Sequence, residues 1–69
     1  MKEENPLTNL QMRLLDQVAR AKNNQEIASL MGMTRDEVVE ELQLVKTALG
    51  VPDRTAAAVW FVKWQYSER

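Results

Sequence analysis

Carboxylates, ammonium groups and guanidinium groups are the side chains of this sequence that could do chemistry, because its 69 residues include no His and no Cys. This composition excludes imidazole acid–base catalysis, thiolate nucleophiles, disulfides and the usual zinc ligands. Glu40 and Glu41 are adjacent carboxylates, but neighbouring residues of a helix point in different directions, and no nucleophile–base pair accompanies them. We therefore expect a binding module and not an enzyme, with no catalytic residue, metal or cofactor.

The size and charge of the chain restrict the partners that we expect. Nine Lys and Arg residues against ten Asp and Glu residues give a formal net charge of −1, whereas domains that bind nucleic acid usually carry a positive field. The longest uncharged apolar run, residues 55–62, is too short to cross a bilayer, and no signal-peptide pattern opens the chain. We expect a cytoplasmic protein with no membrane association. A chain this short buries little surface on folding, so dimerisation is also expected.

Apolar residues at helical spacing, separated by turn residues, predict an all-α domain of four helices. Residues 1–6 are expected to form a flexible tail, residues 7–66 the domain and residues 67–69 a frayed end. The expected helices run from Asn9 to Ala21, from a cap at Asn24 to Met31, from a cap at Thr34 to Leu49, and onward from a cap at Thr55.

The helix ends carry capping residues. Thr8 and Gln11 have the spacing of a capping box, in which two side chains satisfy backbone groups at a helix start, and Thr34 repeats that spacing with an acidic residue. Gly32 and Gly50 follow the second and third helices, where a left-handed residue lets the chain turn. The core positions expected from helical spacing are Leu7, Leu10, Leu14, Leu15, Val18, Ile27, Ala28, Met31, Val38, Leu42, Val45, Leu49, Ala57 and Phe61.

The middle of the chain predicts a helix-turn-helix arrangement: a short helix, a turn that contains Gly32 and Met33, and a longer capped helix. A particular order of caps, turns and core residues extends this pattern without a gap from Leu7 to about Ala58. Its members are Leu7-Thr8, Asn24-Gln25-Glu26-Ile27-Ala28, Gly32-Met33-Thr34, Val38, Leu49-Gly50-Val51, Arg54-Thr55 and Ala57.

This order of residues resembles the LuxR/GerE-type helix-turn-helix domain. Members of that family are mostly bacterial transcription regulators that read DNA with the third helix and dimerise through the fourth. The resemblance implies a four-helix LuxR/GerE-like domain that acts as a small stand-alone transcription regulator and binds DNA as a homodimer. It also implies a protein of bacterial cytoplasm, encoded by a bacterium, a phage or a plasmid.

The third helix departs from the family pattern. The family typically carries Thr-Val-Lys-x-His on this helix and a further Lys near its end. The positions of that Thr, Lys, His and further Lys are occupied here by Glu37, Val39, Glu41 and Ala48. DNA affinity depends largely on neutralised phosphates, so Glu37, Glu40 and Glu41 would weaken it. The alternative function is a helix-turn-helix module that binds no DNA and modulates a transcription factor or polymerase by protein–protein contact. Glu37 also has a structural explanation as a capping residue.

Candidate DNA contacts lie on and around the third helix. Arg35, Lys46 and Arg54 could hold phosphates together with the polar start of the second helix. An Arg at the position of Arg54 is characteristic of the family, and the resemblance implies that it could instead tie the third helix to the fourth. Gln43 could pair with adenine, and Val39 could meet a thymine methyl group or a protein partner. The full candidate set is Asn24, Gln25, Thr34, Arg35, Val39, Gln43, Lys46 and Arg54.

The fourth helix carries two tryptophans that are four residues apart and share one face. Ala57 and Phe61 are expected in the core, which leaves Trp60 and Trp64 largely outward. The alternative is that one of the two tryptophans covers the core. Tryptophan is enriched among interface hot spots, so we expect this face to pair with a second copy or with another transcription regulator. The candidate interface residues are Val59, Trp60, Lys63 and Trp64.

Overall fold

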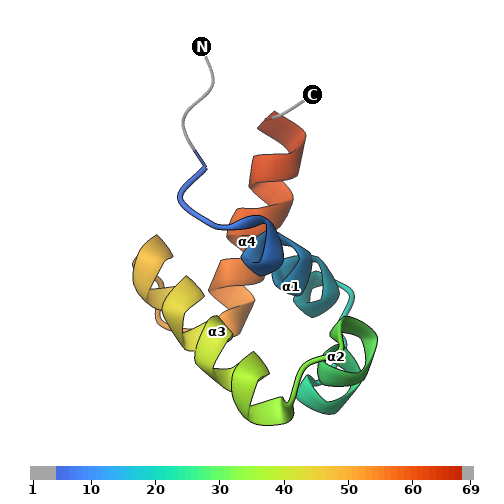
Figure 1. The fold of residues 1–69 in the computed structure, drawn as a ribbon. Helices are drawn as coiled ribbons and strands as arrows, with labels where there is room; N and C mark the ends of the chain where they lie inside the picture. The colour runs from blue at the N-terminus through green and yellow to red at the C-terminus, as the bar shows by residue number, and fades with distance from the viewer. Residues whose placement is uncertain (1–4, 68–69) are drawn as a thin grey trace.

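The computed structural model describes residues 5–67, which form a compact all-α domain with helices α1 (Asn9–Ala19), α2 (Asn24–Met31), α3 (Arg35–Leu49) and α4 (Arg54–Ser67) (Figure 1). The expected four-helix architecture is confirmed. Of the expected tail, only Asn5 and Pro6 lie within the described residues, and the Leu7 amide donates to Asn5 Oδ1 at 2.9 Å. Of the expected frayed end, residues 68–69 lie outside the described residues, and Ser67 is the last residue of α4.

The expected capping boxes of α1 and α3 are confirmed. Thr8 accepts from the Gln11 amide, and the Gln11 side chain accepts in return from the Thr8 amide. Thr34 and Glu37 exchange the same pair of bonds at the start of α3, at 2.8 and 3.0 Å. Gly32 closes α2 and Gly50 closes α3, with φ of 65° and 67° in the left-handed region. These caps determine where the turn between α2 and α3 begins and ends.

The expected caps of α2 and α4 are wrong by one or two residues. Asn23, not Asn24, caps α2, because Glu26 stands three residues after Asn23 and completes a capping box with it. Asp53, not Thr55, is placed as the cap of α4, since its carboxylate accepts from the Ala56 amide at 2.8 Å. In both cases the capping residue lies one or two positions before the residue expected from the sequence.

Helix α1 is two residues shorter than expected. It ends at Ala19 with Arg20 as its C-cap, and Ala21 takes a left-handed φ of 65°. The amides of Ala21 and Lys22 still bond back to carbonyls of α1. The chain therefore turns toward α2 without a glycine.

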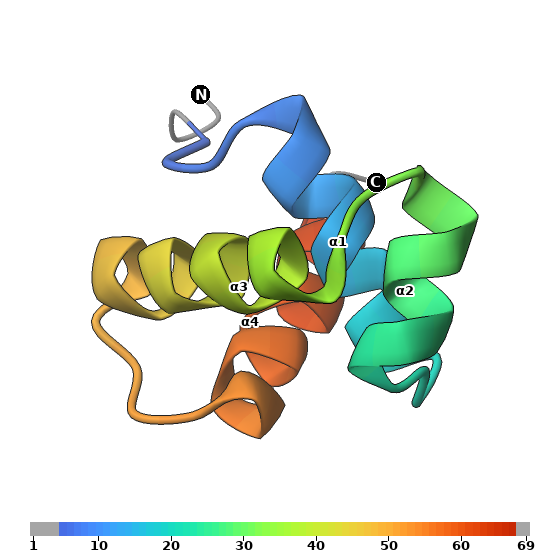
Figure 2. The same ribbon diagram turned by 60° about the horizontal axis from the view of Figure 1, so that its bottom comes forward.

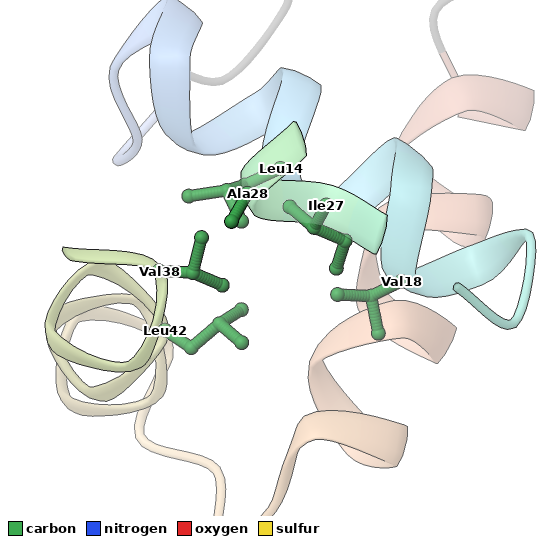
Figure 3. Close-up of a cluster of buried hydrophobic side chains, with 6 residues drawn as sticks. All are labelled: Leu14, Val18, Ile27, Ala28, Val38 and Leu42. Carbon is green, nitrogen blue, oxygen red and sulfur yellow. The ribbon is translucent and has the colours of Figure 1, made fainter. Parts of the chain in front are cut away.

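The core consists of two clusters of buried side chains, and α1 contributes to both. The first cluster joins α1, α2 and α3 (Figure 3) and contains Leu14, Val18, Ile27, Ala28, Val38 and Leu42. The second cluster joins the α1 side of the molecule to α3 and α4 and contains Leu7, Leu15, Val45, Ala57 and Phe61.

Most of the expected core positions are confirmed. Met31 and Leu49 are half-buried and pack against the first and second clusters respectively. Leu10 was expected in the core, but 39% of its surface is exposed. Leu10 is therefore an exposed position between two buried ones, Leu7 and Leu14.

Packing between the helices leaves α2 and α3 at one end of the molecule. Helix α1 packs mainly on α4, and α2 packs mainly on α3. Figure 2 shows the turn that joins α2 to the start of α3 in front of α1, with α4 behind and below α3. The outer sides of α2 and α3 are therefore not covered by another part of the described chain. Across residues 5–67, none of the helices combines the length and apolar character that a membrane span requires.

Candidate nucleic-acid interface

A shallow recess between α2 and α3 brings four of the candidate DNA contacts together. Gln25 of α2 lines one side of it, and Arg35 and Val39 of α3 line the other, with Thr34 at the turn. Val39 is 52% exposed although it is aliphatic. The recess therefore combines an amide, a guanidinium group and an apolar side chain on one accessible surface.

The same side of α3 continues beyond the recess. Arg35, Val39, Gln43 and Lys46 follow one another at steps of four, four and three residues, which is the spacing of one helix face. Gln43 is exposed and Lys46 is half-buried. This row, which we call the recess flank, contains two cations and no carboxylate.

Two of the four carboxylates of α3 are held away from the recess flank. Glu37 accepts from the Thr34 amide as part of the cap. Glu41 is half-buried and accepts from Gln11 Nε2 at 3.2 Å, which links α3 to α1. Asp36, which lines the recess, and Glu40 remain exposed. The negative charge counted along α3 is therefore divided between two sides of the helix.

Arg54 and Asn24 lie apart from the recess and bind each other. Arg54 Nη1 donates to Asn24 Oδ1 at 2.7 Å, and Nη2 donates to the Lys22 carbonyl at 3.2 Å. The guanidinium group thus joins the first residue of α4 to the turn between α1 and α2. The expectation that it links the third helix to the fourth is wrong, and the structure does not bring either residue together with the recess flank.

The N-termini of α2 and α3 are occupied by carboxylates of the chain itself. Glu26 accepts from the Asn23 amide, and Glu37 accepts from the Thr34 amide. A helix N-terminus favours an anion because its first amides and its dipole are positive there. At both helices a carboxylate already lies at the N-terminus, where it would repel a phosphate. The start of α2 is therefore a weaker phosphate-binding position than the sequence suggested.

The two tryptophans of α4 are only partly outward. Trp60 and Trp64 stack with their ring centroids 5.2 Å apart and an interplanar angle of 23°. Both are half-buried, and Trp60 packs against the second core cluster. The expectation that both rings are largely outward is therefore wrong, because Trp60 packs on the core and Trp64 stacks on Trp60. Ala57 and Phe61 are buried as expected.

A different row of α4 presents its apolar side chains to the surface. Val59, Val62 and Tyr66 are 49%, 40% and 66% exposed, and their steps of three and four residues place them on one helix face. Lys63 is exposed beside them. Sequence reasoning included Val59 and Lys63 but missed Val62 and Tyr66, although the same helical spacing would have found them.

Among residues 5–67, no three His, Cys, Asp or Glu side chains are grouped so that they could hold a metal ion. A comparison with protein-family models finds no match to this chain, and a comparison with curated protein sequences finds none either.

Proposed function

We propose that this chain is a helix-turn-helix domain of the LuxR/GerE type that regulates transcription by setting α3 against DNA. The observation that carries the proposal is the recess flank. It gathers Arg35, Val39 and Gln43 on an uncovered side of α3, next to Gln25 of α2, while Glu37 and Glu41 bond elsewhere. A helix that enters a major groove needs such an uncovered row of reading groups.

The side chains of the recess flank divide into two roles. Arg35 and Lys46 are the groups for phosphates, which position a protein on the duplex without reading its sequence. Gln43 and Gln25 carry amides that can pair with the edge of adenine, and Val39 can contact a thymine methyl group. Two cations release few counterions, so we expect a modest affinity and a shallow salt dependence, with a slope of about two.

The proposal is tested by fluorescence anisotropy of the full chain with labelled duplex DNA at about 50 mM and about 200 mM salt. The expected result is measurable binding that weakens by about tenfold between the two salt concentrations, as two phosphate contacts predict. Val39→Lys adds a cation to the recess flank, so it should raise affinity several-fold and steepen the salt dependence by about one unit of slope.

Gln65→Lys is the matched control, because it adds the same charge at an exposed position of α4. Its effect on affinity should be small if α3 is the surface that meets the duplex. The proposal fails if neither the original chain nor Val39→Lys binds at the lower salt concentration, or if the two lysine variants gain affinity equally.

A protein-binding module is the second candidate function. Two observations favour it. Arg54 and Asn24 bond to each other and lie apart from the recess flank, and Asp36 and Glu40 are exposed carboxylates that would repel phosphates. In that case the domain would modulate a transcription factor or polymerase through protein contact. Absence of DNA binding in the experiment above would favour this function.

A further inference from the structure

A groove with an apolar floor runs between the end of α1 and the outer side of α4, two helices that lie against each other (Figure 1). It has a volume of about 780 Å³. Val18 and Ala21 line it from the α1 side, and Ala58, Val59 and Val62 line it from α4. This α1–α4 groove is distinct from the recess between α2 and α3, so its role does not depend on the proposed contact with DNA.

The charges that line the α1–α4 groove all have one sign. Among residues 5–67, Lys22, Arg54 and Lys63 line it, and no carboxylate does. The hydrogen-bond acceptors of Arg54 are the Asn24 amide oxygen and the Lys22 carbonyl, both neutral. Its positive charge is therefore not cancelled by these contacts, and the groove favours a partner that carries negative charge.

The spacing and length of the exposed row indicate what shape of partner fits. Val59, Val62 and Tyr66 extend over about two turns of α4, and the lining residues from Arg54 to Tyr66 extend over about 18 Å at the rise of an α-helix. An amphipathic helix of three to four turns matches this length and can lay its apolar stripe along such a groove.

We propose that the α1–α4 groove binds an acidic amphipathic helix of a partner protein. The apolar stripe of that helix would cover Val59 and Val62, and Asp or Glu residues beside the stripe would face Lys22, Arg54 and Lys63. A groove of this kind uses apolar burial for affinity and charge to select the partner.

A second copy of this chain fits the groove less well. Two copies related by a twofold axis would present the same patch to each other. Both patches carry Lys22, Arg54 and Lys63, so like charges would meet across the interface, and like-charge juxtaposition disfavours a complex. The charge pattern therefore argues for a partner of the opposite sign.

The probe for the test is a labelled synthetic helix of about four turns with leucine at positions i, i+3, i+4 and i+7 and glutamate at the flanking positions. Its binding to the full chain is measured by fluorescence anisotropy, together with that of a peptide in which lysine replaces each glutamate. The acidic peptide should bind, and the basic peptide should bind much more weakly.

Lys63→Glu should weaken binding of the acidic peptide about five- to tenfold, because a rim charge is reversed. Arg13→Glu is the matched control, since it makes the same kind of reversal at an exposed residue of α1 outside the groove lining, and it should change binding little. Val62→Gln should weaken both peptides by removing apolar area from the floor.

Three results would overturn the proposal. The first is no binding of the acidic peptide at millimolar concentration, and the second is equal binding of the acidic and basic peptides. The third is a dimer in sedimentation equilibrium that Val62→Gln dissociates, because this result would assign the groove to a second copy. None of these readouts involves DNA, so failure of this proposal is distinguishable from failure of the proposed contact between α3 and DNA.

Discussion

The Arg54 guanidinium group connects the start of α4 to the start of α2 and to the turn before it. Its two bonds reach residues 30 and 32 positions earlier in the chain, and such contacts can stabilise a small domain that has few long-range connections. Arg54→Ala should lower the free energy of unfolding by about 1–2 kcal/mol, because bonds to a charged group are stronger than neutral ones.

The measurement for Arg54→Ala is urea denaturation followed by circular dichroism, with Arg13→Ala as the control at an exposed position of α1. The control should stay within about 0.5 kcal/mol of the original chain. Equal urea midpoints for the two variants would contradict this expectation, because they would show that the contacts of Arg54 contribute nothing to the free energy of unfolding.

Leu10 and Leu15 test the boundary of the core on one helix. Leu15 is fully buried in the second cluster, whereas Leu10 is 39% exposed. Leu15→Ala should lower the free energy of unfolding by about 2–5 kcal/mol through lost burial and a cavity. Leu10→Ala removes the same atoms and should cost about 1 kcal/mol or less. Similar losses for both variants, measured by thermal or urea denaturation, would place Leu10 in the core.

At the scale of the helices, left-handed residues decide where three of the turns begin. Ala21 has φ of 65° and Gly32 has φ of 65°, but only glycine adopts this conformation without a steric cost. Ala21→Gly should therefore raise the free energy of unfolding by about 0.5–1 kcal/mol, and Gly32→Ala should lower it by about 1 kcal/mol.

The two substitutions form a matched pair, since a Cβ at Gly32 would meet no atom within 4 Å. Any loss in Gly32→Ala then reflects backbone conformation and not a clash. Differential scanning calorimetry of both variants gives the comparison. A drop in melting temperature for Ala21→Gly would contradict the expectation and would mean that the greater freedom of glycine in the unfolded chain outweighs the relief in the folded one.

Helix ends could be predicted from the sequence wherever one local pattern stood alone. Thr34 with Glu37, and Gly50 after α3, offered no competing neighbour, and both were confirmed. Asn23 and Asn24 offered two equivalent caps, and the choice depended on which of them had an acidic residue three positions later. Where two adjacent residues can make the same local bond, the third-neighbour partner decides between them.

The candidate site was less predictable than the helix ends, because charge along a sequence does not tell which side of a helix it occupies. The capping-box spacing already indicated a structural role for Glu37, but counting charges along α3 did not distinguish Glu40 from Glu41. In the folded chain, Glu41 bonds to Gln11 of α1 and Glu37 bonds within its own cap. The contact of Arg54 with Asn24 likewise joins residues 30 positions apart, which no local pattern indicates.

On the scale of the whole molecule, the described chain presents two surfaces of different character. The recess between α2 and α3 has a mixed polar and apolar lining with charges of both signs, and the α1–α4 groove is apolar with cations along it. They share none of their lining residues. A domain arranged in this way could bind two partners at once, one on each surface.

The placement of Leu14 and Leu15 makes α1 common to both parts of the core. These adjacent residues enter different clusters, one with α2 and α3 and the other with α3 and α4. Opening of α1 would therefore remove a buried leucine from each cluster simultaneously. The two clusters are therefore expected to unfold together, because both depend on the same 11-residue helix.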